Sequence, residues 1–288
     1  MCSAPAATRL DSPKKEVSGW RGVGEVSGRP DSAAARALTA SAAAWFAAAA
    51  LGQWVFVYYI ASFYGPSSLT GDFAAWRRNT HLIKGYIPGD TMGNLAFAAH
   101  ALLAGYVAFG GGVQLVPAIR ARVPSLHRWN GRVFLSAALA LSVTGLYMVW
   151  ARGASFNLLA AFAISLNAAL IVLFGVLAWR AAVRRDFIAH RRWALRTYLV
   201  ANGQWFIRIG VIAWVIANQG HAKIGPFFRF WQFGCYLVPL AVLELYLHAK
   251  DGAGRSGRYA MAGFLGLLTL LMGAGTIGAY MFIWRPYL

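Results

Sequence analysis

The chain has 288 residues, of which 59% are hydrophobic and only 12% are charged, about half the charged fraction of a typical soluble domain. This composition argues against a soluble protein and indicates a protein of the lipid bilayer. The formal net charge of +18 does not predict nucleic-acid binding, because the basic residues lie mostly between apolar segments, where they orient membrane proteins. The two cysteines, Cys2 and Cys235, are far apart in sequence and match no zinc-binding spacing.

The first 33 residues differ from the rest of the chain in composition. Residues 1–33 are rich in Ser, Gly, Pro, Ala and charge, which predicts a disordered cytoplasmic tail. The remainder, residues 34–288, is predicted to form one transmembrane helical domain. It contains seven apolar runs, each long enough to cross about 30 Å of hydrocarbon as a helix. The sequence therefore predicts an all-α polytopic bundle with spans near 38–61, 94–116, 133–150, 157–179, 194–217, 227–248 and 259–283.

The basic residues predict the orientation of this bundle. If the tail is cytoplasmic, 19 of the 27 Lys and Arg residues fall in inner segments and 7 in outer segments, with Arg208 inside a span. Cytoplasmic segments carry this kind of excess, so we expect the N-terminus inside and the C-terminus outside. The first outer connection, about 62–93, is predicted to be a long loop in which Asp90 or Thr91 caps the second span.

Two similar basic-aromatic clusters precede apolar runs on the predicted inner side. LHRWNGR ends at Arg132 and AHRRWALR ends at Arg196. Arg and Trp at these places are typical of membrane anchoring at the headgroups, but anchoring does not explain a His in each cluster. The pattern therefore also predicts a basic pocket for a small anion or an anionic lipid headgroup. Its predicted residues are His127, Arg128, Arg132, His190, Arg191, Trp193 and Arg196.

Ionisable residues inside the spans are costly and are functional candidates by default; here they are His100, Arg208 and Glu244. At 1.5 Å per residue, Arg208 lies ~21 Å and Glu244 ~6 Å from the inner ends of their helices. This difference excludes a pair between them and predicts that Glu244 balances the clusters near Arg132 and Arg196. In the outer half, Arg208 and His100 are expected to share a polar cavity, with Asp90 and Asp72 as candidate counter-charges.

Two other functions remain open from the residues alone. The histidines fall into an outer and an inner layer, as in membrane cytochromes that hold haem b, and His100, His127 and His190 are the candidate axial ligands. Such a protein would transfer electrons. A structural or accessory membrane subunit is the third possibility, because no nucleotide-binding, metalloprotease or nucleophile-elbow motif is present.

One further pattern joins several of these positions. A His in one helix precedes a Gln and the motif His-Arg-x-x-Gly-Arg; later, His-Arg-x-Trp-x-x-Arg precedes an Arg in the same helix and a Glu in the next. The pattern resembles a family of bacterial predicted multi-pass membrane proteins containing a domain of unknown function, over roughly residues 94–248. The resemblance implies a bacterial cytoplasmic membrane protein and the same candidate residues, without a reaction. The matching residues are His100, Gln114, His127, Arg128, Gly131, Arg132, His190, Arg191, Trp193, Arg196, Arg208 and Glu244.

Overall fold

The computed structural model describes residues 32–79, 82–221 and 224–288, and this part of the chain is helical with short connections. The predicted tail lies outside it, except for Ser32 and Ala33, which begin the first helix. The helices are α1 (Ser32–Thr70), α2 (Thr91–Leu115), α3 (Pro117–Arg122), α4 (Pro124–Trp150), α5 (Leu158–Val183), α6 (Phe187–Ala201), α7 (Gly203–Ala217), α8 (Ile224–Gly252) and α9 (Arg255–Ala279), with short turns η1 (Phe73–Arg78), η2 (Tyr280–Trp284) and η3 (Arg285–Tyr287).

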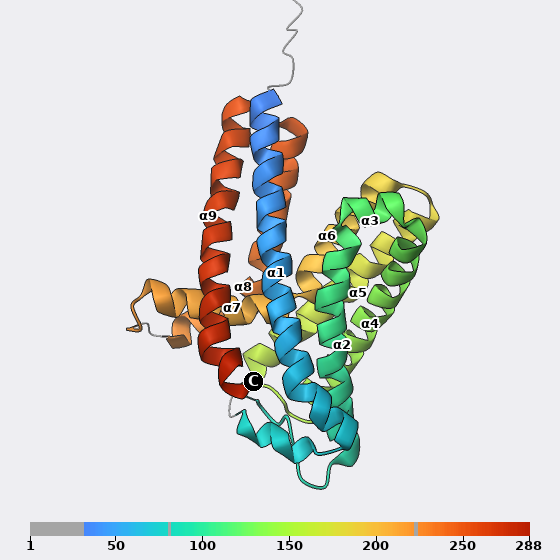
Figure 1. The fold of residues 1–288 in the computed structure, drawn as a ribbon, viewed down its shortest axis with the longest axis vertical. Coiled ribbons are helices and arrows are strands. Elements are labelled where there is room, and N and C mark those ends of the chain that lie inside the picture. Colours follow the sequence, from blue (N-terminus) through green and yellow to red (C-terminus); the bar gives the residue numbers. More distant parts are fainter. Residues whose placement is uncertain (1–31, 80–81, 222–223) are drawn as a thin grey trace, which may run out of the picture.

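Apart from α7, the long helices run alternately up and down, so most of their connections gather at two ends, whereas α7 runs sideways and ends away from both (Figure 1). One end holds the start of α1, the short helix α3, and the α5–α6 and α8–α9 connections. We call it the arginine-rich end, because ten arginines lie between residues 120 and 196 in its connections and adjoining helix turns, apart from Arg152. The opposite end holds η1 and the C-terminus. This alternation agrees with the predicted grouping of segments except after α7, which does not reach the end predicted for it, and it does not depend on which end faces the cytoplasm.

The described helices are long and apolar enough to cross a membrane six times, or seven times if one bent pair counts as a span. The bent pair is α6 and α7, which differ in direction by 58°. The prediction of a continuous fifth span at 194–217 was therefore wrong in detail. α6 descends from the arginine-rich end to the middle of the bundle, and α7 leaves sideways from there (Figure 1).

The break between α6 and α7 has a local cause in the sequence. Asn-Gly is a turn dipeptide, and here Asn202 and Gly203 separate the two helices. The side-chain amide of Asn202 donates to the carbonyl of Tyr198 at 2.8 Å, which satisfies one of the last carbonyls of α6. Composition alone shows no break, because the residues on both sides are apolar.

The first connection at the opposite end is shorter than predicted. α1 continues through Pro66 to Thr70, so residues 62–70 of the predicted loop are helical, and Phe73–Arg78 adds a 3-10 turn. The predicted cap is confirmed: the carboxylate of Asp90 accepts a hydrogen bond from the Gly93 N–H at 2.9 Å. An aromatic cluster anchors this region, where the rings of Tyr59 and Phe63 stack at 5.6 Å between centroids and Trp76 is 1% exposed.

Candidate functional site

Both basic-aromatic clusters lie in the first turns of a helix at the arginine-rich end. α4 starts at Pro124, whose ring suits the first helical position because no N–H bond is needed there. α6 starts after Asp186, whose carboxylate accepts the Ala189 N–H at 3.0 Å. The structure therefore places the two clusters as the sequence predicted, at two helix starts.

The two clusters also share an internal geometry. The guanidinium carbon of Arg132 lies 4.8 Å from the centre of the Trp129 ring, and that of Arg196 lies 4.7 Å from the centre of the Trp193 ring. Residues three apart on a helix are neighbours, so each Arg stacks on the Trp one turn before it. Trp193 is packed further, against Phe174 of α5, whereas Trp129 is 64% exposed.

Glu244 of α8 pairs with Arg196 by two hydrogen bonds of 2.8 and 2.7 Å, which is the counter-charge that the depth argument predicted. The pair is half open, since the side chains are 16% exposed for Arg196 and 52% for Glu244. A second pair joins Arg192 to Asp251 at 2.6 Å. Arg132 is not part of either ion pair, so Glu244 is a counter-charge for the second cluster and not for the first.

Gln114 of α2 organises the first cluster. Its amide nitrogen donates to the carbonyl of His127 at 3.0 Å, and its amide oxygen accepts from Asn130 at 2.9 Å. A Cβ added at Gly131 would lie 2.7 Å from this amide nitrogen, so the glycine of the His-Arg-x-x-Gly-Arg motif leaves the room that Gln114 occupies. Asn130 and its partner Tyr106, at 2.9 Å, were missed by the sequence analysis, because neutral polar residues carry little sequence signal.

Each cluster contributes one histidine, and the two differ in their hydrogen bonding. His190 places its Nδ1 2.9 Å from the carbonyl oxygen of Ala178 on α5, so this nitrogen donates and Nε2 remains for another partner. The Nδ1 of His127 is buried without a hydrogen-bond partner. Arg128 and Arg191, the remaining predicted site residues of the clusters, are exposed.

His100 and Arg208 do not share the polar cavity that was predicted for them. The Nδ1 of His100 lies 2.9 Å from the Thr144 hydroxyl oxygen, between α2 and α4. The guanidinium of Arg208 instead bonds the carbonyl of Gln204 on its own helix and lies 5.1 Å from the centre of the Phe56 ring on α1. The two side chains therefore face different helices, which distance along a helix axis does not show.

Asp90 is not a counter-charge for Arg208, as had been expected, because it pairs with Arg152. The Arg152 Nε lies 2.9 Å from the Asp90 carboxylate, and a second guanidinium nitrogen donates to Asn94 at 3.0 Å. These hydrogen bonds join the α4–α5 connection to the start of α2. Arg152 is only 7% exposed, so the network is buried. Arg152 is one of the seven basic residues of the predicted outer segments, and nothing in its neighbourhood along the chain indicates burial.

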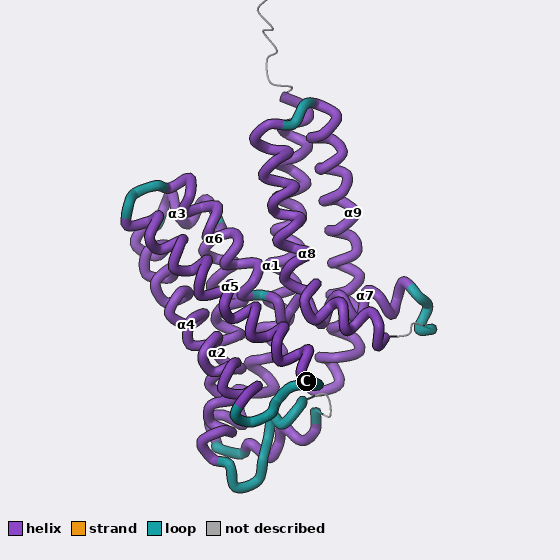
Figure 2. The backbone as a smooth tube through the Cα atoms, turned by 180° about the vertical axis from the view of Figure 1, so that it is seen from behind, coloured by secondary structure: helices purple, strands orange, loops and turns teal. Residues whose placement is uncertain are grey.

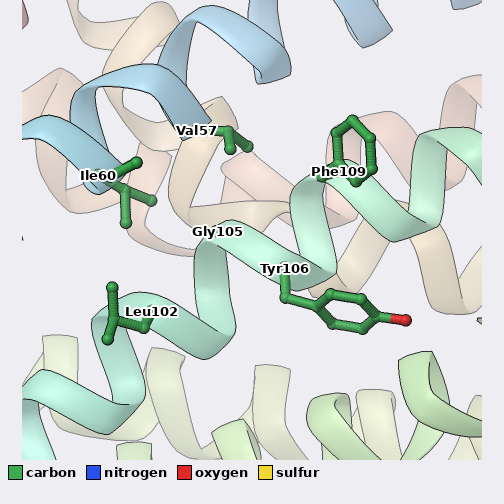
Figure 3. Close-up of a pocket in the computed structure, with 7 residues that line it drawn as sticks. Val57, Ile60, Leu102, Gly105, Tyr106 and Phe109 are labelled. Carbon is green, nitrogen blue, oxygen red and sulfur yellow. The ribbon is translucent and has the colours of Figure 1, made fainter. Parts of the chain in front are cut away.

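An apolar groove of about 210 Å³ lies between α1 and α2, lined among others by Ile60, Gly105 and Tyr106 (Figure 3). Its floor is Gly105, where a side chain is missing, and the Tyr106 hydroxyl points away from α1. The groove has no charged lining residue, so it does not belong to a site for anions.

Within the described ranges, no group of three or more His, Cys, Asp or Glu residues is placed to hold a metal ion. Haem binding needs only two axial ligands, so this observation does not decide the cytochrome hypothesis. His127 and His190 both lie at the arginine-rich end, whereas His100 bonds Thr144 between α2 and α4. Haem thus remains a prediction from sequence.

A family model described as a predicted membrane protein (DUF2306) matches residues 97–247, which is more than half of the chain. The match covers α2 to most of α8 and contains both clusters, Arg208 and Glu244. No curated protein and no solved structure matches the chain.

Proposed function

Because the chain belongs to the DUF2306 family of predicted membrane proteins, we propose that this multi-pass protein binds or transports an anion at its arginine-rich end. The ligand is a phosphate-like anion, either free or as the headgroup of an anionic lipid. We further propose that this end faces the cytoplasm and that the membrane is the bacterial cytoplasmic membrane, since the excess of Lys and Arg lies on this side.

The observation that carries the proposal is the charge balance of the described residues at this end. Its acids are already engaged: Glu244 bonds Arg196, Asp251 bonds Arg192, and Asp186 caps α6. Arg128, Arg132 and Arg191 have no acidic partner among the residues described. Guanidinium groups without an acid attract anionic groups and match phosphate geometry with two parallel hydrogen bonds.

The stacked tryptophans support recognition and not only attraction. A long Arg side chain loses conformational entropy when it binds a ligand, which weakens binding. Contact with Trp129 restrains Arg132 before any ligand arrives, and the guanidinium edge keeps its donors. Arg196 stacks on Trp193 in the same way, but Glu244 already accepts two of its hydrogen bonds, so Arg132 is the stacked arginine that remains open to a ligand.

Each cluster also contributes a histidine. The Nδ1 of His190 donates to the carbonyl of Ala178 on α5, which leaves Nε2 available to a ligand.

The test is the thermal unfolding of the full chain in a neutral detergent, with and without phosphatidylglycerol. We expect the lipid to raise Tm of the wild type in a saturable way, and Arg132→Ala to remove most of the rise. Arg132 is preferred to Arg196 because the latter also holds Glu244, so its loss would weaken the fold itself. Inorganic phosphate replaces the lipid in a second arm and separates a free anion from a headgroup.

Arg77→Ala is the matched control, because Arg77 also stacks on an aromatic ring, that of Tyr86 at 4.7 Å, but at the opposite end of the bundle. It should leave the ligand-dependent rise unchanged. Equal loss in both variants, or a full rise in Arg132→Ala, would contradict the proposal.

The two other functions predicted from sequence have their own tests. A haem protein purified from haem-replete cells should show a Soret band that weakens in His127→Ala and His190→Ala. If the chain is an accessory subunit whose clusters only anchor helices, the clusters should tolerate conservative changes. A variant with Lys in place of the cluster arginines and Phe in place of the tryptophans should then still rescue the deletion phenotype.

A further inference from the structure

We propose that the break between α6 and α7 is a second site, which holds a small uncharged molecule that both donates and accepts hydrogen bonds. The site lies in the middle of the bundle, away from the arginine-rich end (Figures 1 and 2). It is independent of the anion site proposed above.

The first reason is the interrupted backbone. The N–H groups of Trp205 and Phe206 both bond the carbonyl of Asn202, and the helix changes direction by 58° at this point. Figure 2 shows the short connection at mid-height, enclosed by helices. Non-helical backbone at membrane depth is tolerated where protein or a polar cavity surrounds it, and such breaks form the binding sites of many transporters.

The second reason is a buried amide on α1 with a free donor. The Gln53 side chain is fully buried, and its amide oxygen accepts from the Tyr198 hydroxyl at 2.7 Å. Tyr198 belongs to the last turn of α6, so this bond holds Gln53 at the break. The amide nitrogen of Gln53 has no hydrogen-bond partner.

Two more groups meet on the side of α7 and α9. A Cβ added at Gly52 would lie 2.6 Å from the Trp205 ring and 2.9 Å from the Thr276 hydroxyl oxygen, so these two side chains are neighbours across the glycine. Trp205 is 1% exposed. Its indole N–H and the Thr276 oxygen are both buried without a partner.

Buried polar groups without hydrogen-bond partners also occur on the side of the break that faces α5 and α8. A Cβ at Gly203 would lie 3.3 Å from the Asn167 amide nitrogen and 3.6 Å from the Cβ of Tyr236. The amide oxygen of Asn167 is buried without a partner. Gln232 lies one helical turn before Tyr236 and is 5% exposed, and neither its oxygen nor its nitrogen has a partner.

These groups define the chemistry of the ligand. Buried polar side chains are almost always hydrogen-bonded, and one that is not destabilises the fold. The unpartnered groups include the donors of Gln53 and Trp205 and the acceptors of Asn167 and Thr276, with both kinds on Gln232. None of these side chains carries a charge. The fitting partner is thus neutral and bifunctional: water, or a small alcohol or amide.

The test is the direction in which Tm moves when a buried amide is replaced. In the full chain in detergent, Gln232→Leu should lower Tm by roughly 2–4 °C or more, because it removes hydrogen bonds to the bound molecule. If no molecule is bound at the break, Gln232→Leu removes an unsatisfied amide and should raise Tm. A raised Tm would therefore overturn the proposal. Gln204→Leu is the control, because that amide is exposed beside the same break.

A second measurement on the wild type keeps the proposal testable if Gln232→Leu does not fold. Backbone amides at 202–206 should exchange with deuterium at least ~10-fold faster than those of 171–175 in mid-α5, since water reaches the break. Equal protection of the two segments would contradict a hydrated site.

Titration with acetamide and with glycerol distinguishes the sources of the ligand. A saturable rise in Tm that is absent from Gln232→Leu identifies an organic solute. A Tm independent of both solutes, together with a lowered Tm in Gln232→Leu, identifies water; either result supports the shared chemistry.

Discussion

Arg196 bonds Glu244 of α8 and stacks on Trp193 of its own helix, and the other contact of the Trp193 ring is Phe174 of α5. Depth along the helices predicted Glu244 as a counter-charge near Arg132 and Arg196, and the structure pairs it with Arg196 and not with Arg132. The same arithmetic failed for His100 and Arg208, since two residues at similar depth can face different neighbours around the helix. Arg152 was missed for a related reason: its burial depends on Asp90 and Asn94, which are far away in sequence.

At this scale we predict that Glu244→Gln lowers the free energy of unfolding by about 1 kcal/mol, because the carboxylate is half exposed and its pairing is partly screened. Chemical or thermal unfolding in detergent measures the change. In Arg196→Gln combined with Glu244→Gln, the two losses should not add, since either substitution alone already breaks the pair. Additive losses would show that the pair contributes no stability.

α2 and α4 pack through small residues and shared amides, which explains the spacing of the His-Arg-x-x-Gly-Arg motif. Gly131 lies opposite Gln114, and Asn130 bonds both Gln114 and the carbonyl of Gly110.

The apolar runs predicted α2, α4, α5, α8 and α9 to within a few residues at most boundaries, but α4 begins nine residues earlier than its predicted span. The break at Asn202 could have been found from its Asn-Gly dipeptide, although apolar composition masked it.

For this pair of helices, we predict that Gly131→Ala destabilises the protein by roughly 1–3 kcal/mol, because the added methyl would overlap the Gln114 amide and break its bond to His127. Gly266→Ala in α9 is the control. A Cβ there meets nothing within 4 Å, so the change should be neutral or slightly stabilising. Tm should therefore fall in Gly131→Ala and stay the same or rise slightly in Gly266→Ala; a Gly131→Ala variant as stable as Gly266→Ala would contradict the packing argument.

Apart from α7, the helices place their connections at two ends of the molecule, and the prediction of which end faces the cytoplasm rests on charge alone. Ser155 lies in the α4–α5 connection at the end opposite the arginines, and Ser256 starts α9 at the arginine-rich end. Helix geometry predicts only that the two residues lie on opposite sides. The excess of Lys and Arg predicts which side is cytoplasmic.

We therefore expect a membrane-impermeant maleimide to label Ser155→Cys in intact cells and Ser256→Cys only after the membrane is opened. The background carries Cys2→Ser and Cys235→Ser, so that no native thiol reacts. Labelling of both sites in intact cells would argue against a bilayer between them, and the reverse pattern would invert the proposed orientation.

The length of α1 has a practical consequence for imaging. Its 39 residues extend ~58 Å, far more than the ~30 Å of hydrocarbon, and together with α8 and α9 it rises beyond α2–α6 at the arginine-rich end (Figure 1). Small membrane proteins are hard to align in electron micrographs because a micelle hides them. Here three packed helices stand clear of the other helices, and the turn between α8 and α9 at 253–254 lies at their tip. A rigid helical fusion inserted at that turn would give each particle a visible arm without touching either proposed site.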